Sequence, residues 1–219
     1  RMAPVGTLSD VDSADLNRMT VTLTARPDGN AVESLSLNAA ATTVASGAGL
    51  TVSYTASTGV LLITGKASTA TYQTRLQGIL SNNTSDQPTT SSRSITVVAR
   101  DSTNASSTSR TATITVTAVN DASTIASLSG DSRAYSEGAG AVVIESGNAL
   151  VADVDSTNFD TGTLTVSIPA GGDSAEDFLS IRNQGTGAGQ IGVSGSTVTY
   201  QGVTIGTFTG GSSGSNLVI

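Results

Sequence analysis

The chain has 219 residues, no Cys and no His, and a net charge of −7 from 17 acidic and 10 basic side chains. The lack of Cys excludes disulfides and thiolate chemistry, and the lack of His excludes a Ser-His-Asp mechanism and histidine-bound zinc. An acidic chain is a poor partner for nucleic acid, which needs a basic surface, but it suits cations. No stretch comes near the roughly 18 consecutive apolar residues of a membrane-spanning helix, so we expect no membrane insertion of this segment.

Ser and Thr make up about 30% of the residues, whereas aromatic residues make up 3% and Trp is absent. Thr and Val suit a half-buried strand, and Ser and Gly suit turns. The composition therefore predicts an all-β protein whose interior is filled by Val, Leu, Ile and Ala. The length has room for one or two domains that each bury a core.

The first half of the chain carries regularly spaced strand signals. Residues 18–26 alternate with a period of two, which predicts a strand with one buried face. Residues 27–30, Pro-Asp-Gly-Asn, predict a turn, and residues 56–59 predict a hairpin-like connection. Residues 71–80 place apolar side chains at helical spacing, which predicts a short helical turn. Further strands are expected at 33–37, 50–55, 59–64, 94–99 and 111–119.

The second half begins with apolar segments at 125–128 and 141–144. It continues with strands expected near 163–168, 177–181, 196–200 and 203–208, and with a final apolar run at 217–219. Short strands at regular intervals, separated by turn residues, are typical of a β-sandwich or a barrel.

A diverged internal repeat relates the two halves. Asp10-Val11-Asp12-Ser13 recurs as Asp153-Val154-Asp155-Ser156, and in the same register residues 20–24 match residues 163–167. Such self-similarity predicts two copies of one structural unit. We place the first at residues 1–121 and the second at residues 122–219.

Each copy lacks a counterpart of part of the other, so we expect both units to be incomplete at the chain ends, as in a fragment of a longer repeat protein. In an alternative interpretation, the missing strands come from neighbouring chains, as in donor-strand assembly.

Four short motifs occur in a characteristic order along the whole chain, and together they resemble the cadherin-like repeats of large bacterial surface proteins and adhesins. They are the Asp-x-Asp pairs Asp10/Asp12 and Asp153/Asp155, Val98-Ala99-Arg100-Asp101, the closing Val119-Asn120-Asp121-Ala122, and Ser136-Glu137-Gly138. The resemblance implies two tandem cadherin-like (Ig-like) β-sandwich domains with structural Ca²⁺. The cadherin Leu-Asp-Arg-Glu segment is not found, and Arg100 places a positive charge next to Asp101.

The acidic pairs also suggest a cation site on physical grounds. Ca²⁺ takes six to eight oxygen ligands, and an Asp-x-Asp directs two carboxylates to one side, where they repel unless a cation lies between them. At the junction we expect the ligands Asn120, Asp121, Asp153 and Asp155; at the N-terminal end of the first unit, Asp10, Asp12 and Asp101; and at the far end of the second unit, Glu137. The competing interpretation is that these Asp residues only cap turns.

The sequence predicts a non-catalytic structural or adhesion repeat of a long extracellular or cell-surface protein, which acts as a calcium-rigidified stalk or extender. Its partners would be neighbouring repeats of the same protein. One alternative is a subunit of an extracellular filament or surface layer, assembled by strand exchange or lateral β packing. Another is a carbohydrate- or protein-binding module. An enzyme is not expected, because no convergent catalytic set is present.

Overall fold

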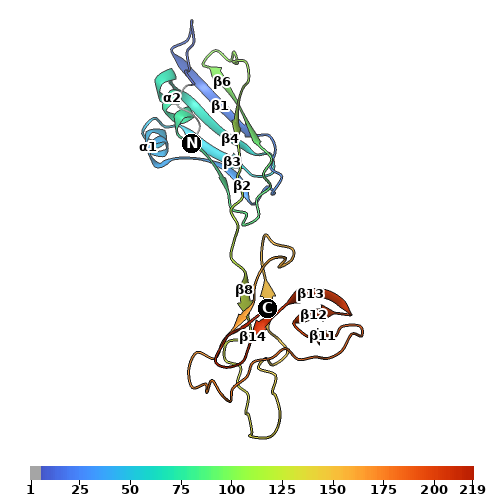
Figure 1. The fold of residues 1–219 in the computed structure, drawn as a ribbon. Coiled ribbons are helices and arrows are strands. Elements are labelled where there is room, and N and C mark those ends of the chain that lie inside the picture. The colour runs from blue at the N-terminus through green and yellow to red at the C-terminus, as the bar shows by residue number, and fades with distance from the viewer. Residues whose placement is uncertain (1–5) are drawn as a thin grey trace. The chain divides into compact units, whose positions relative to one another are not determined.

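The computed structural model describes residues 6–219 and is rich in β structure (Figure 1). Over these residues it contains fifteen strands and two short helices. This confirms the β-rich fold that the amino-acid composition predicts. The chain divides into two compact units, residues 1–121 and residues 122–219, and each is described by itself.

Seven strands build the first unit. They are β1 (Asp15–Leu23), β2 (Glu33–Leu37), β3 (Thr51–Thr55), β4 (Val60–Ser68), β5 (Ile79–Asn83), β6 (Arg93–Asp101) and β7 (Arg110–Ile114). Five of them form an antiparallel sheet in the order β3-β4-β1-β6-β7, and β2 pairs separately with β5. The strand expected at 33–37 is confirmed to the residue, whereas the one expected at 111–119 ends early, at Ile114.

The alternation of apolar and polar residues explains why β1 and β6 form strands with one buried face. Buried and half-buried positions alternate along the whole of β6, and in β1 Met19, Val21 and Leu23 are buried on one face. The expected hairpin is confirmed, with Thr55 opposite Val60. Gly59 closes this turn at φ +68°, and a Cβ there would lie 2.6 Å from the Leu23 carbonyl oxygen, so the turn requires glycine.

Two helices join the strands. Helix α2 (Thr69–Gln77) confirms the helical turn expected within 71–80, although β5 takes over at Ile79. Helix α1 (Ala39–Gly47) was not expected from the sequence. Its signal is the N-cap Asn38, whose side chain accepts the Ala41 N–H at 2.8 Å. An Asn followed by three Ala residues is a helix start that an apolar-periodicity search overlooks.

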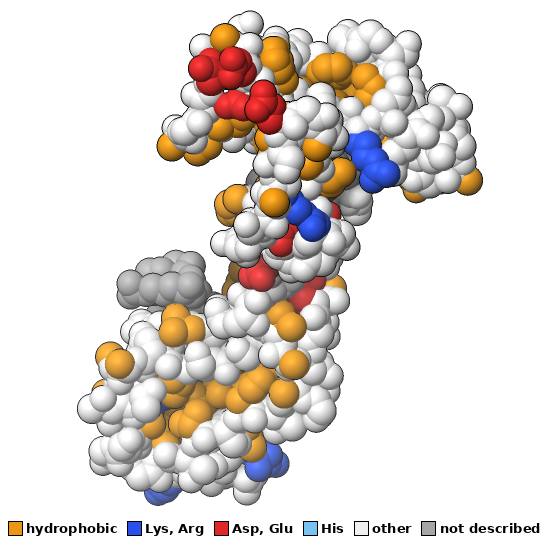
Figure 2. All heavy atoms as spheres, turned by 90° about the horizontal axis from the view of Figure 1, so that it is seen from below, with side chains coloured by type: hydrophobic (Ala, Val, Ile, Leu, Met, Phe, Trp, Pro, Cys, Tyr) orange, Lys and Arg blue, Asp and Glu red, His pale blue; other side chains and the backbone are white. Residues whose placement is uncertain are grey.

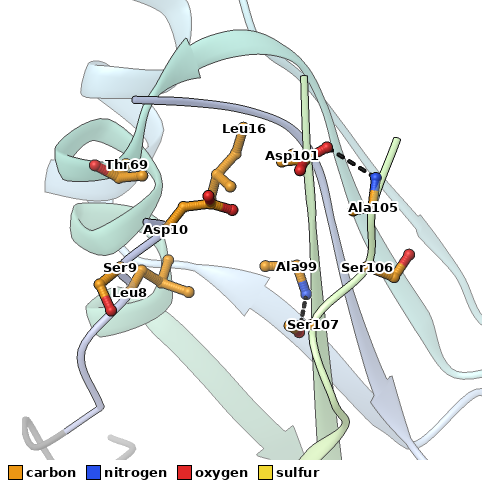
Figure 3. A pocket seen from close by; sticks show the side chains of 10 residues that line it. All are labelled: Leu8, Ser9, Asp10, Leu16, Thr69, Ala99, Asp101, Ala105, Ser106 and Ser107. Atoms are coloured by element: carbon orange, nitrogen blue, oxygen red, sulfur yellow. Dashed lines mark hydrogen bonds between the residues drawn. The ribbon is translucent and has the colours of Figure 1, made fainter. Parts of the chain in front are cut away.

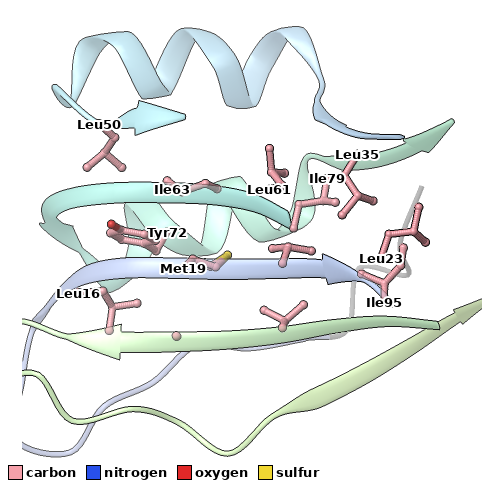
Figure 4. Close-up of a cluster of buried hydrophobic side chains, with 13 residues drawn as sticks. Leu16, Met19, Leu23, Leu35, Leu50, Leu61, Ile63, Tyr72, Ile79 and Ile95 are labelled. Atoms are coloured by element: carbon pink, nitrogen blue, oxygen red, sulfur yellow. The ribbon is translucent and has the colours of Figure 1, made fainter. Parts of the chain in front are cut away.

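The core of the first unit lies where the five-stranded sheet meets β2, β5 and α2 (Figure 4). Strands β1, β4 and β6 contribute most of its side chains, and Leu35, Ile79 and Tyr72 come from the other three elements. Most of these side chains are aliphatic, as the composition predicts, and Tyr72 adds an aromatic ring. The buried set is Leu16, Met19, Val21, Leu23, Leu35, Leu50, Leu61, Ile63, Tyr72, Ile79, Ile95, Val97 and Ala99.

A buried ion pair ties the two β layers of this unit together. Arg93, at the start of β6, donates from Nε to Glu33 Oε2 at 2.9 Å and from Nη2 to Glu33 Oε1 at 3.2 Å. Glu33 begins β2, and both side chains are 2% exposed. Arg93 also contacts Asp28 in the turn before β2. The pair therefore links the start of β6 to the start of β2.

The second unit contains shorter strands. They are β8 (Thr124–Ala126), β9 (Leu150–Ala152), β10 (Thr165–Val166), β11 (Ile191–Ser194), β12 (Thr197–Tyr200), β13 (Val203–Thr207), β14 (Thr209–Gly210) and β15 (Leu217–Val218). They form the antiparallel groups β8-β9, β11-β12-β13 and β10-β15-β14. The strands expected at 196–200 and 203–208 are confirmed, and the one expected at 163–168 is reduced to two residues.

The strand expected at 177–181 is wrong. Its start is taken up by a turn, in which the Asp177 N–H donates to the Asp173 carbonyl at 2.8 Å and Asp177 Oδ2 accepts the Asp173 N–H at 2.6 Å. One ladder-like bond remains, from the Leu179 N–H to the Gly211 carbonyl at 2.8 Å. Because the local turn uses the backbone groups, alternation alone does not produce a strand here.

Apolar burial differs sharply between the units. In the described part of the second unit, the buried hydrophobic side chains are Val198 and Leu217. Many others are exposed, among them Phe159 at 49% and Leu164 at 42%. Figure 2 shows hydrophobic side chains at the molecular surface. None of the helices in residues 6–219 has the length and apolar character that crossing a bilayer requires.

Candidate cation site

A tight turn before β1 presents the first acidic pair. Asp10 Oδ1 accepts the backbone N–H of Asp12 at 3.2 Å and of Ser13 at 2.9 Å. The Ser13 hydroxyl donates to the Asp15 carbonyl at 2.8 Å and lies 3.1 Å from the Ser102 hydroxyl. The turn is therefore held against the loop that follows β6.

Asp101 ends β6 on the buried face of the strand and is 4% exposed. Its Oδ1 accepts three hydrogen bonds from the following loop: from the Thr103 N–H at 2.8 Å, the Thr103 hydroxyl at 3.0 Å and the Ala105 N–H at 2.8 Å. A buried polar group is costly unless it is hydrogen-bonded, and these three donors meet that need. The loop thus fixes Asp101 and leaves its other oxygen outside these three bonds.

The pairing of β1 with β6 brings the carboxylates together. Leu16 lies opposite Asp101, so the turn before β1 meets the end of β6. Asp10, Asp12 and Asp101 each offer an oxygen within 4.8 Å of the other two, and in residues 6–219 they are the one such group of three acidic side chains. Beside them lies a pocket of about 180 Å³ that Asp10, Asp101, Leu8, Leu16 and Ser107 help to line (Figure 3).

The charges within this group interact. The hydrogen bond with Asp12, together with the backbone N–H groups of Asp12 and Ser13, lowers the pKa of Asp10. The same contact with Asp10, followed by the charges of Asp10 and Asp101, raises the pKa of Asp12. The opposite shifts of the two groups show that the Asp10 and Asp12 carboxylates lie close enough to repel each other. A bound cation would remove this repulsion.

The donor set fits a hard cation. The group offers carboxylate oxygens only, which suits Ca²⁺ better than softer metals. Arg100 does not point into the site, because alternation along β6 places it on the opposite face from Asp101. Its Nε donates to the Asn104 carbonyl at 3.1 Å. The Arg100 guanidinium is therefore hydrogen-bonded to the loop backbone and is not directed at Asp101.

The second acidic pair repeats the turn of the first. Asp153 Oδ1 accepts the N–H of Asp155 at 3.2 Å and of Ser156 at 2.9 Å, the same two bonds with the same lengths as at Asp10. The Ser123 hydroxyl donates to Asp153 Oδ2 at 2.9 Å, and this bond is the main cause that lowers the pKa of Asp153. The repeated sequence is therefore a repeated local structure.

Among the described residues, the other predicted ligands do not form a second group of three carboxylates. The Asn120 amide donates to the Asp121 carbonyl at 2.6 Å, and both residues close the first unit. Glu137 is exposed, in a turn closed by the Ala139 N–H and the Ser136 carbonyl at 3.0 Å. A junction site shared by Asn120, Asp121, Asp153 and Asp155 stays a prediction, as does a ligand role for Glu137.

Supporting residues were missed from the sequence. Thr103 and Ala105 hold Asp101, and Ser13 with Ser102 holds the turn at Asp10. An Asp at a strand end followed by Ser-Thr-Asn is a signal for a loop that folds back on the carboxylate. The approach of Ser13 to Ser102 has no comparable local signal, because it depends on strand pairing.

Comparison with known proteins finds no relative: no protein-family model, no curated protein and no solved structure matches the chain.

Proposed function

We propose that this chain is a non-catalytic structural part of a long extracellular or cell-surface protein, in which Ca²⁺ stiffens tandem β-sandwich repeats of the cadherin-like kind. The observation that carries the proposal is the meeting of Asp10, Asp12 and Asp101 beside one pocket. The recurrence of the same Asp turn at Asp153 supports it, because a stalk repeats its joints along the chain.

In this proposal the chain's own residues prepare the site. The loop after β6 holds Asp101 in place, and the turn at Asp10 sets two further carboxylates beside it. Ca²⁺ would neutralise the negative charge that these carboxylates bring together. Binding would tie the segment before β1 to the end of β6 and reduce its freedom to move.

At the junction, Asn120 and Asp121 would join Asp153 and Asp155 in a second site, and Glu137 would serve the far end of the second unit. Neighbouring repeats of the same protein would be the partners. Acidic side chains that repel in the absence of metal would then control how freely one repeat moves against the next.

Calorimetric unfolding of the full chain, with Ca²⁺ and with chelator, tests the proposal. A cation bound only by the folded state raises stability with the logarithm of its concentration, by about 2.7 kcal/mol at 100 times its Kd. We expect a calcium-dependent rise in Tm that is lost in Asp10→Asn/Asp12→Asn. Asn keeps a side-chain oxygen that can cap the turn, so the variant removes charge rather than the fold.

The exposed Asp86→Asn is the control, because it makes the same Asp-to-Asn change at one position of the same unit outside the site. It should leave the calcium effect intact. A Tm that does not respond to calcium in the unmodified chain would contradict the proposal and would leave the Asp residues as turn caps.

A further inference from the structure

Two arginines lie side by side at one end of the outer face of the five-stranded sheet in the first unit. Arg18 of β1 is opposite Arg100 of β6. Their neighbours in sequence, Met19 and Ala99, are 0% and 6% exposed in the core. Because side chains alternate along a strand, both arginines point to the other face of the sheet, away from the core.

A lysine adds to this charge. Lys66 of β4 is exposed, and its neighbour Ala67 packs against the core, which places Lys66 on the same outer face as the arginines. Asp15 at the start of β1 forms an ion pair with Lys66 at 3.4 Å. Arg18, Lys66 and Arg100 together form what we call the basic patch.

The basic patch carries more positive charge than its surroundings neutralise. Like charges directly opposite each other in an antiparallel pair repel. Within residues 6–219 the ion pairs involve Lys66 and Arg93, and neither Arg18 nor Arg100 takes part in one. Asp101 follows Arg100 in the chain but lies on the buried face, so the sheet separates the two charges. The two arginines therefore have no ion-pair partner among the described residues.

Hydroxyl groups continue the row that the arginines begin. Arg18 also lies opposite Thr64 of β4, and Thr64 lies opposite Thr51 of β3. Neighbouring strands are about 4.8 Å apart, so the row of Arg100 and these three residues is about 14 Å long. This part of the outer face is therefore polar, with positive charge at one end and hydroxyls beside it.

The arrangement discriminates among anionic partners. A guanidinium group binds carboxylates and tetrahedral oxyanions through two parallel hydrogen bonds. Duplex DNA carries one charge per about 1.7 Å of its axis and requires an extended basic surface, whereas the basic patch is confined to one end of a sheet in a chain of net charge −7. A polysaccharide with acidic groups on some of its sugars has more widely spaced charges, and its hydroxyls can exchange hydrogen bonds with threonine side chains.

We propose that the basic patch binds an acidic polysaccharide. Arg18 and Arg100 hold its sulfate or carboxylate groups, and Lys66 adds attraction over a longer range. Thr64 and Thr51 exchange hydrogen bonds with the sugar hydroxyls. Because the attraction is electrostatic, binding weakens as the salt concentration rises. The inference is independent of the proposed cation site, whose residues take no part in it.

Titration of the full chain in chelator, followed by fluorescence anisotropy, tests the inference with two labelled probes. One is a sulfated heparin hexasaccharide, and the other is an oligogalacturonate, whose acidic groups are carboxylates alone. We expect saturable binding of at least one probe at low salt. Arg18→Gln should weaken that binding about tenfold, because it removes the charged bidentate donor. Arg110→Gln is the matched control, since it removes one positive charge from an exposed arginine of the same unit outside the patch, and it should change the affinity little.

Unfolding of the variant would not explain weaker binding, because Arg18→Gln relieves the repulsion with Arg100 and should not lower Tm. Failure of both probes to bind would overturn the inference, as would equal losses of affinity in Arg18→Gln and Arg110→Gln. Equally tight binding of a labelled single-stranded DNA or of a polyglutamate peptide would also overturn it, since the patch would then respond to negative charge alone.

Discussion

Two arginines are buried in the first unit under very different conditions. Arg93 is 1% exposed and forms a bidentate pair with Glu33. Arg75 is fully buried; its Nη1 donates to the Ala41 carbonyl at 2.7 Å, and its Nε and Nη2 have no partner among the described residues. Burial lowers the pKa of Arg75, whereas the hydrogen bond to Glu33 raises that of Arg93.

The two arginines should therefore respond differently to substitution by Met. Arg93→Met leaves Glu33 buried without its partner and should lower the free energy of unfolding by about 3–5 kcal/mol. Arg75→Met removes unpaired donors and keeps the aliphatic volume, so its cost should stay below about 1 kcal/mol. Urea denaturation of the full chain measures both. Equal losses would show that Arg75 also has a stabilising role.

The lowered pKa of Asp28 leads to a prediction about the stability of the first unit at low pH. The hydroxyl of Thr89 above all, with the Thr89 N–H, Asn83 and Arg93, lowers its pKa from 3.8 to about 2. Because the folded pKa is below the unfolded one, the stabilisation is complete above pH 3.8 and is lost as the pH falls toward about 2. Thermal unfolding between pH 5 and pH 2 should show a smaller loss in Asp28→Asn than in the unmodified chain. Parallel curves would contradict this assignment.

At the scale of elements, one glycine permits the contact between the helices. The Asn38 N–H donates to the Gly78 carbonyl at 2.8 Å, which joins the start of α1 to the end of α2. A Cβ at Gly78 would lie 2.3 Å from Ala41 Cβ and 3.0 Å from Asn38 Oδ1. The contact therefore depends on the missing side chain rather than on an unusual backbone angle.

Gly78→Ala should lower the free energy of unfolding by about 1–3 kcal/mol, because α1 must move away from its cap. Gly47→Ala is the control: it lies at the last position of α1 with nothing within 4 Å of an added Cβ, and it should be neutral or slightly stabilising. Urea denaturation compares the two variants. If Gly78→Ala is as harmless as Gly47→Ala, the helices do not depend on this close contact.

At the scale of the whole molecule, two copies of one sequence pattern reach different degrees of packing. The first unit buries its alternating residues between β layers, and the second leaves equivalent residues exposed. Both copies therefore keep the residues that form the local turns and begin the strands. The burial of each copy is a separate matter, because in the described part of the second unit only Val198 and Leu217 are buried hydrophobic side chains.

The sequence by itself determined the features that depend on near neighbours. The alternation in β6 and the hairpin at Gly59 are local, so composition and spacing predicted them. The repeated turns at Asp10 and Asp153 are local as well, and turn capping was the competing interpretation of these residues. The strand expected at 177–181 failed for the same kind of reason, since Asp173 and Asp177 form a competing local turn.

Only the tertiary structure decided which distant residues meet. The pairing of Leu16 with Asp101 brings β6 to the turn at Asp10, and Arg93 reaches Glu33 across the layers. Such contacts follow from strand order and register, which long-range burial of the whole core selects and which local spacing does not specify. The sequence named Asp10, Asp12 and Asp101 as candidates, and the pairing of β1 with β6 placed them within reach of one ion.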